Sequence, residues 1–320
     1  MKKILISSLA FSALLLVSCK TEFDQDVKDI KVSNGKADFS KYVALGNSLT
    51  SGYRDGALYL DGQTESYPSM IAKSMERAGG SQNFNQPLMD DNNGGLLLPT
   101  PGGNVQIADT KLYLKGFVDG SPILENVNMN AAKNVFKNIY TASTPFQNLG
   151  VPGAKSFHLV YSGYGNAAGI VPKTANPYYA RFASSSSATV LGDAMAQNPT
   201  FFSLWIGNND TLGYATSGGD ATLDQITPKT TFDAAYGALI NTLTSKGAKG
   251  VVANLPYVTN IPFFTTVPYK PVPGAKIAPN IASLTTLYTQ LKGALAYLGV
   301  TDRIVEMPSA TAPIRAFMHD

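Results

Sequence analysis

Two patterns of apolar positions alternate along the chain beyond residue 39. Apolar runs at Tyr42–Leu45, Phe201–Ile206 and Gly250–Leu255 predict strands. The run at Phe201–Ile206 is nearly continuous, as is typical of a strand that is covered on both faces. Two longer segments, Thr231–Lys246 and Ser283–Leu298, carry apolar residues at spacings of three and four, which predicts amphipathic helices. Strands that alternate with helices predict an α/β fold with a parallel sheet and crossover helices.

Residues 54–147 break this alternation. They are rich in Gly, Asn and Pro, and apart from helices predicted at Tyr67–Arg77 and Met129–Ile139 we expect loops there. A structureless stretch of this length within a compact domain is usually functional or an insertion. We therefore interpret it as a large insertion between the first and second strands of the sheet. Nearer the C-terminus, the pattern predicts a loop over Pro256–Pro279 and a strand over Arg303–Met307.

The N-terminus has the features of an export signal. Two lysines precede Ile4–Val17, a 14-residue, mostly apolar stretch that is too short to span a bilayer comfortably and suits a signal peptide. The following Leu-Val-Ser-Cys resembles the lipobox of bacterial lipoproteins, which implies cleavage after residue 18 and a lipid on Cys19. Residues 19–38 are dense in charge and are interpreted as a solvated tether, followed by a domain at 39–320.

This leader predicts a location in the cell envelope, as an outer-membrane or cell-surface lipoprotein held to the membrane by its lipid. The acidic residues after Cys19 loosely resemble the surface-export signals of Bacteroidetes lipoproteins. Cys19 is also the only cysteine, so an intramolecular disulfide is impossible.

Composition narrows the classes of partner. The chain is 44% hydrophobic and 15% charged, which is enough apolar material for a sizeable core and too little charge for a disordered chain. The net charge is +3 and no basic stripe is interleaved with aromatics, so we do not expect nucleic acid as a partner. Two isolated histidines and one cysteine offer few metal ligands. The oxygen-rich run at 90–95 lacks the Glu spacing of an EF-hand and is interpreted as a polar loop. No metal or cofactor is expected.

Three short segments carry the candidate chemistry. Gly46-Asn47-Ser48-Leu49 follows the first predicted strand, Gly207-Asn208-Asn209-Asp210 follows another, and Asn148–Gly153 forms a Gly-rich turn. Ligands of open parallel sheets bind at the carboxyl ends of the strands, so a Ser, a Gly turn and an Asn are expected in one crevice. A Ser hydroxyl attacking an ester builds an oxyanion, which backbone N–H groups and an Asn amide can stabilise.

In their residues and in their order along the chain, these segments resemble the blocks of the SGNH, or GDSL-type, hydrolases. The resemblance implies a flavodoxin-like three-layer α/β/α fold and hydrolysis of carboxylic esters, as in esterases and lipases. It assigns the nucleophile to Ser48 and the oxyanion donors to Gly153 and Asn209, with the N–H of Ser48 as a further donor. The family's first block usually has Asp where this chain has Asn47, a change that we expect to be tolerated.

The family's general base is a His in a C-terminal Asp-x-x-His block, which this chain lacks. His158 has no Asp three residues before it and is interpreted as a partly buried structural histidine. His319 has Ala316 at the position of the Asp. Three possibilities stay open for the base: it is absent, it lies downstream of residue 320 in a chain truncated at its C-terminus, or it is His319.

The sequence also bears on two other functional classes. The missing base, together with 16 Tyr and 15 Phe, is compatible with a non-catalytic surface lipoprotein that binds glycan or lipid on the same fold. An α/β-hydrolase is disfavoured, because no Gly stands two residues after Ser48. The natural ester and the oligomeric state have no readable signal in the sequence.

Overall fold

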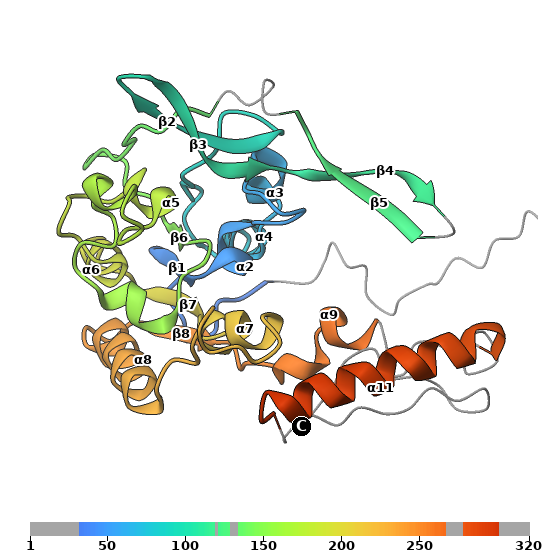
Figure 1. Ribbon diagram of the computed structural model, residues 1–320. Helices are drawn as coiled ribbons and strands as arrows, with labels where there is room; N and C mark the ends of the chain where they lie inside the picture. Colours follow the sequence, from blue (N-terminus) through green and yellow to red (C-terminus); the bar gives the residue numbers. More distant parts are fainter. Residues whose placement is uncertain (1–31, 119–120, 129–133, 267–277, 301–320) are drawn as a thin grey trace, which may run out of the picture. The chain divides into compact units, whose positions relative to one another are not determined.

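The computed structural model describes residues 32–118, 121–128, 134–266 and 278–300. These residues form two compact units, whose elements are labelled in Figure 1. The first unit holds the described residues up to Trp205 together with Ala234–Val252. The second holds Ile206–Asp233 and the described residues from Ala253 onward.

The first unit is built on a four-stranded sheet, all of whose strand pairs are parallel. The order is β6-β1-β7-β8, with β1 at Tyr42–Gly46, β6 at Asn148–Gly150, β7 at Phe201–Trp205 and β8 at Lys249–Val252. Every residue of β1 is buried, as the apolar run predicts for an inner strand. The parallel α/β prediction is confirmed, whereas the strand predicted to reach Leu255 ends at Val252.

Short helices accompany this sheet. The first unit contains α2 (Ser48–Ser51), α3 (Leu60–Thr64), α4 (Tyr67–Glu76), η3 (Ser156–Val160), η4 (Ala167–Gly169), α5 (Pro177–Ala180) and α6 (Val190–Met195). Helix α8 (Lys229–Thr244) begins in the second unit and ends in the first. Within the second unit lie α7 (Asn209–Thr216), η5 (Val258–Asn260), α9 (Pro262–Thr265), η6 (Ala278–Asn280) and α11 (Ile281–Tyr297).

Apolar packing joins the helices to the strands. Ala72 of α4 lies in one buried cluster with Tyr42, Ala44 and Phe201. Helix α8 buries a stripe of Ala235, Leu239 and Leu243 at spacings of four, which confirms the amphipathic helix predicted there. It stops before Gly247, whose φ of +81° is left-handed and whose N–H donates to the C=O of Thr244 at 2.9 Å.

The insertion between β1 and β6 is more ordered than its composition indicates. The predicted helix at Tyr67–Arg77 is confirmed as α4, but two antiparallel hairpins replace the expected loops. They consist of β2 (Gly94–Thr100) with β3 (Gly103–Thr110), and β4 (Leu112–Val118) with β5 (Ser121–Asn126). The glycines that suggested a loop instead serve the first hairpin, since Gly94 and Gly103 have φ of +72° and +114°.

The helix predicted at Met129–Ile139 is wrong over its described part, 134–139, which has no helical residue. Val135 forms a parallel bridge with Leu97 of β2. The buried Asn134 accepts from the N–H of Asp90 at 2.7 Å and donates to the C=O of Gly94 at 3.2 Å. These long-range bonds require an extended backbone and override the local apolar spacing.

The second unit confirms the helix predicted at Ser283–Leu298 as α11, which has no buried residue. Short helices, η5 and α9, occupy part of the expected loop over Pro256–Pro279. The strand predicted at Arg303–Met307 lies outside the described residues. Across the part of the chain that is described, every helix is too short or too polar to cross a membrane.

Candidate active site

Ser48 is the first residue of α2, two residues after the end of β1. The preceding residue, Asn47, is buried and caps the helix, with its side-chain oxygen accepting from the N–H of Leu49 at 3.0 Å. The C=O of Asn47 also accepts from the N–H groups of Thr50 and Ser51, at 3.1 and 3.0 Å. A carboxylate oxygen could accept the same capping bond, so Asn47 performs here what an Asp would.

The hydroxyl and the backbone N–H of Ser48 have no hydrogen-bond partner among the described residues. The side chain is half-buried, and neither its Oγ nor its N–H takes part in a hydrogen bond with a described residue. Its C=O is held instead, by the Oγ of Ser51 at 2.9 Å and the N–H of Tyr53 at 3.0 Å. The backbone is therefore fixed while a hydroxyl and an N–H stay available.

Glycines on both neighbouring strands allow α2 to lie against the sheet. A Cβ on Gly150 of β6 would lie 2.3 Å from the backbone N of Ser51. A Cβ on Gly46 would lie 2.0 Å from the Oγ1 of Thr50 and 2.4 Å from the C=O of Trp205. These distances are far below van der Waals contact, so any side chain at Gly46 or Gly150 would displace the helix that carries Ser48.

Gly153 lies in a turn that is bonded to the end of β1. The N–H of Ala154 donates to the C=O of Val151 at 3.1 Å, and Gly153 has φ of +79° after Pro152, the pattern of a type II turn. The N–H of Val151 donates to the C=O of Gly46 at 3.0 Å. Gly153 is exposed, and its N–H donates to no described residue. This hydrogen bond between Val151 and Gly46 joins the two segments of the candidate site: Ser48 follows Gly46 by two residues, and Gly153 follows Val151 by two residues.

Sequence reasoning missed Asn148 as a residue of the site. It is buried, its side-chain oxygen accepts from the N–H of Gly150 at 3.0 Å, and its Nδ2 donates to the C=O of Thr50 at 3.0 Å and to Gln86 at 2.8 Å. One amide therefore ties β6, α2 and the insertion together. The signal was present, because Asn148 opens the Asn-x-Gly-x-x-Gly block of which only Gly153 was given a role.

Hydroxyl pairs join α2 to α4 and β1 to β7. The Oγ1 of Thr50 lies 3.0 Å from the OH of Tyr67, and the OH of Tyr42 lies 2.7 Å from the Oγ of Ser203. Burial raises the pKa of both the Tyr42 and the Tyr67 phenols, because a phenolate would be poorly solvated there. These phenols stay neutral and can both donate and accept hydrogen bonds.

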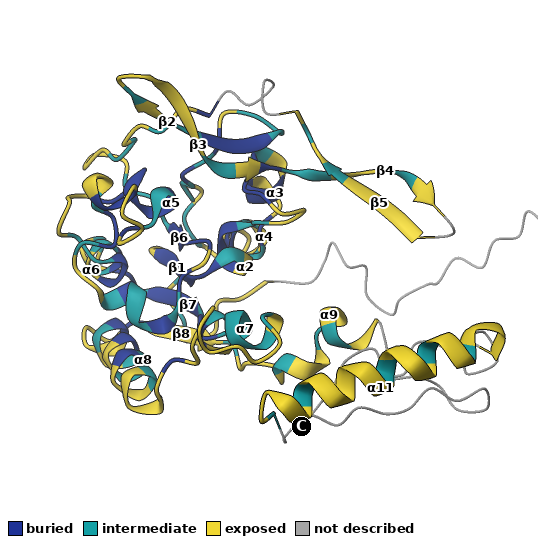
Figure 2. Ribbon diagram, viewed as in Figure 1, coloured by how far each residue is buried: buried dark blue, intermediate teal, exposed yellow. Residues whose placement is uncertain are grey.

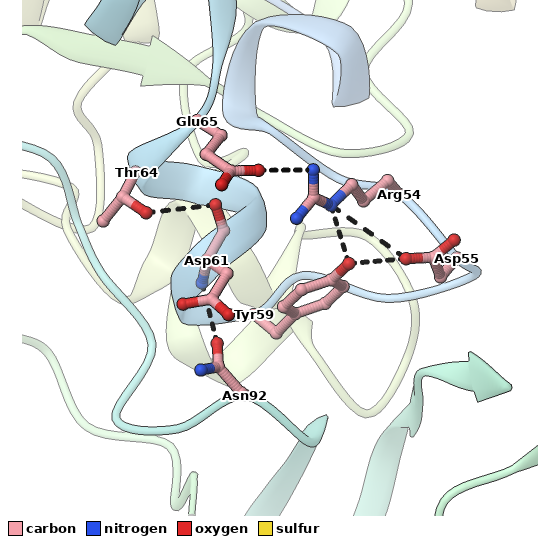
Figure 3. A network of polar contacts seen from close by, with 7 residues as sticks. All are labelled: Arg54, Asp55, Tyr59, Asp61, Thr64, Glu65 and Asn92. Carbon is pink, nitrogen blue, oxygen red and sulfur yellow. Dashed lines mark hydrogen bonds and ion pairs between the residues drawn. The ribbon is translucent and has the colours of Figure 1, made fainter. Parts of the chain in front are cut away.

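A second polar network fixes the chain just after α2 (Figure 3). The Nε of Arg54 donates to the OH of Tyr59 at 2.7 Å, and that OH donates to Asp55 at 2.5 Å. The Nη1 of Arg54 pairs with Glu65 at 2.8 Å. Tyr59 also lies under the cations of Arg54 and Lys111, at 5.4 and 4.7 Å from its ring centre. The segment that follows Ser48 is thereby held to α3.

Asn209 is the first residue of α7 and belongs to the second unit. It is half-buried and follows Gly207, whose φ is +120°. In the first unit, Gly46 is paired with both Gly150 and Trp205. Strands β1, β6 and β7, which lead to Ser48, Gly153 and Asn209, therefore end side by side at the carboxyl end of the sheet. The role of Asn209 itself stays a prediction.

His158 is placed as a structural residue. Its Nδ1 accepts from the N–H of Lys155 at 3.0 Å, and its ring stacks on Tyr164 at 4.4 Å with an angle of 9°. A neutral imidazole that accepts at Nδ1 carries its proton on Nε2. The lone pair on Nδ1, which would act as the base, therefore already accepts a hydrogen bond from the backbone. His319 and Cys19 lie outside the described residues.

The oxygen-rich run at 90–95 serves the fold. The side chain of Asp91 accepts from the N–H of Asn93 at 2.8 Å, and that of Asn92 accepts from the N–H of Asp61 at 2.8 Å. No cluster of three His, Cys, Asp or Glu side chains that could hold a metal occurs in the described ranges.

Comparison with known proteins finds no matching family model, no matching curated protein and no matching solved structure. What is inferred about function therefore rests on the residues of this chain.

Proposed function

We propose that this protein hydrolyses carboxylic esters on an SGNH-type fold, with Ser48 as the nucleophile. The observation that carries the proposal is the pair of unoccupied groups on Ser48, next to a Gly153 turn bonded to the same strand end. Acyl transfer requires a hydroxyl that is available as the nucleophile and N–H groups that are available to bind the oxyanion. The hydroxyl of Ser48 and the N–H groups of Ser48 and Gly153 meet this requirement.

In the proposed reaction, the Oγ of Ser48 attacks the ester carbonyl carbon and its proton passes to a general base. The oxyanion accepts hydrogen bonds from the N–H groups of Ser48 and Gly153 and from the amide of Asn209. The base then protonates the leaving alcohol, and an acyl-serine remains. Water, deprotonated by the same base, releases the acid and restores Ser48. Each oxyanion donor is worth about 10²–10³-fold in kcat.

The base in this proposal is a histidine other than His158, whose Nδ1 lone pair is occupied by the N–H of Lys155. The resemblance to SGNH hydrolases favours a histidine near the C-terminal end of the domain, and His319 is the candidate that the sequence holds. A triad without its base loses about 10⁶ in kcat, so measurable turnover would itself indicate that a base is present.

The Ser48→Ala variant tests the nucleophile. We expect the wild-type chain to cleave short-chain aryl esters and Ser48→Ala to fall to the background rate, a loss of about 10⁶ at most. Ser51→Ala is the matched control on the same helix: it removes one hydrogen bond to the C=O of Ser48, worth about 1 kcal/mol, and should stay within about tenfold of wild type. A fluorophosphonate should label Ser48 and no other serine. Equal turnover by wild type and Ser48→Ala would contradict the assignment.

The second candidate is a non-catalytic protein that binds glycan or lipid. It is favoured by one observation: no imidazole contacts the Oγ of Ser48 among the described residues. Absence of both ester turnover and fluorophosphonate labelling in the wild-type chain would support it.

The proposal also places the protein on the envelope through a lipid on Cys19, supported by the apolar leader and the lipobox-like residues before it. Cys19→Ala should move the protein from the membrane fraction to the soluble fraction, or leave it with an uncleaved leader of larger mass. A lipid-free wild-type protein, or unchanged mass and fractionation in Cys19→Ala, would contradict lipidation.

A further inference from the structure

The β4–β5 hairpin carries a continuous row of apolar residues on one face, which ends at the polar Asn126 paired with Leu112. Its register places Leu114 opposite Leu124 and Phe117 opposite Pro122, with a register shift between Leu114 and Gly116. Directly paired residues share a face, and residues two apart on one strand do too. Leu114, Phe117, Pro122 and Leu124 therefore lie together. We name these four residues the ribbon face.

The opposite face is amphipathic. Tyr113 is paired with Glu125 and donates to its carboxylate at 3.3 Å. Lys115 forms an ion pair with the same carboxylate, so the charges of the hairpin neutralise one another and lie away from the ribbon face. Ile123 also belongs to this side, since it neighbours Leu124 along the strand.

The ribbon face is open to solvent. Leu114 is 51%, Phe117 65% and Leu124 54% exposed, and Figure 2 shows the hairpin largely in the colour of exposed residues. A two-stranded hairpin is marginal in water without an apolar surface to rest on.

Size and charge favour a lipid surface over a protein as the occupant. Strands of seven and six residues give a face about 20–23 Å by 10 Å, or about 200–230 Å². A stable protein interface needs about 800 Å² per partner, so this face is too small for a second copy or a permanent protein partner. A lipid surface needs no minimum matching area, because binding scales with the apolar area that is buried. The absence of charge on the face excludes recognition of an acidic or basic partner.

We propose that the ribbon face docks on the acyl region of a lipid surface, with Lys115 and Glu125 left at the water side. Docking is reversible, is driven by apolar contact and is independent of the charge of the lipid. It does not depend on the chemistry at Ser48. If the proposed ester hydrolysis holds, its substrates are esters presented at a lipid–water interface.

A single-cysteine probe tests the contact locally. Cys19 is the only cysteine, so the full chain with Cys19→Ala gives a background without lipid anchor or native thiol. Leu124→Cys is added on the ribbon face and Tyr113→Cys on the opposite face, each labelled with a polarity-sensitive fluorophore. Phosphatidylcholine vesicles should shift the emission of the Leu124→Cys label to the blue and enhance it at least twofold. The Tyr113→Cys label should change much less. Salt at 0.5 M, or added anionic lipid, should leave the shift unchanged.

Three outcomes would overturn the proposal. No shift at Leu124→Cys would mean that lipid does not reach the ribbon face. Equal shifts on both faces would mean that the contact is not confined to it. A shift that grows with protein concentration in the absence of vesicles would assign the face to a second copy of the chain. Each outcome is independent of ester turnover, so failure here and failure at Ser48 are distinguishable.

Discussion

At the scale of single residues, the position of Ser48 depends on side chains that are absent as much as on those that are present. Gly46 and Gly150 leave space for α2, and Asn148 and Asn47 satisfy the backbone groups around it. The sequence pattern indicated Ser48 and Gly153, because a small polar residue after a buried strand and a Gly-rich turn are local signals. It could not indicate that Gly150 and Ser51 touch, since they are far apart along the chain.

Gly150→Ala tests this packing. Its Cβ would meet the backbone of α2, which cannot rotate away as a side chain can, so we expect a loss of about 3 kcal/mol or more in the free energy of unfolding. Any esterase activity should fall with it. The control is Gly237→Ala inside α8, where a Cβ meets nothing within 4 Å. There the helix propensity of Ala should raise stability by about 0.5–1 kcal/mol. Urea unfolding of both variants measures the change in the free energy of unfolding. A similar change in Gly150→Ala and Gly237→Ala would contradict the packing argument.

At the scale of elements, the strands and helices with clear periods were predictable and the hairpins of the insertion were not. Buried strands β1 and β7 and helices α4, α8 and α11 follow the apolar spacing within a few residues. The hairpins of the insertion are rich in Gly and Pro and were expected to be loops. Their strands form because partners lie close along the chain, and Gly103 at the turn of the first hairpin adopts a left-handed φ.

At Met129–Ile139 a helix was predicted where the described chain is not helical, and contacts with residues far along the chain again explain the difference. The local spacing of apolar residues fitted a helix, but Val135 and Asn134 satisfy bonds on β2 and on the loop before it. Tertiary pairing outweighs a propensity difference that amounts to a fraction of a kcal/mol per residue. The ribbon face likewise emerged only from the register of β4 with β5, because the bulge changes which residues share a side.

At the scale of the whole molecule, buried tyrosines link stability to alkaline pH. Burial raises the pKa of Tyr42, Tyr164 and Tyr178, whereas in the unfolded chain a tyrosine titrates near about 10. Above that pH the unfolded state loses these protons and the folded state keeps them. The stability that neutral tyrosines contribute is therefore complete below pH 10 and is lost as the pH rises through the raised values.

Tyr178→Phe isolates one of these groups. Tyr178 is 8% exposed, and its OH has no hydrogen-bond partner among the described residues, so the ring of Phe can replace it. From pH 6 to 9 the difference in unfolding free energy between variant and wild type should be constant. Above pH 10 the variant should lose stability less steeply, by about 1.4 kcal/mol per pH unit. Parallel curves up to pH 11, measured by urea unfolding, would show that Tyr178 ionises alike in both states.

The sequence by itself determined the parallel α/β architecture, the amphipathic helices and a short set of candidate residues. Apolar periodicity and turn residues act over a few positions, so a linear reading recovers them. Only the tertiary structure decided that the strands preceding Ser48, Gly153 and Asn209 end side by side. It also decided that Asn148 ties three elements together, and that the Nδ1 of His158 accepts a backbone hydrogen bond. Strand register, close backbone contact and burial depend on residues far apart in the chain, and these physical quantities form only when the chain folds.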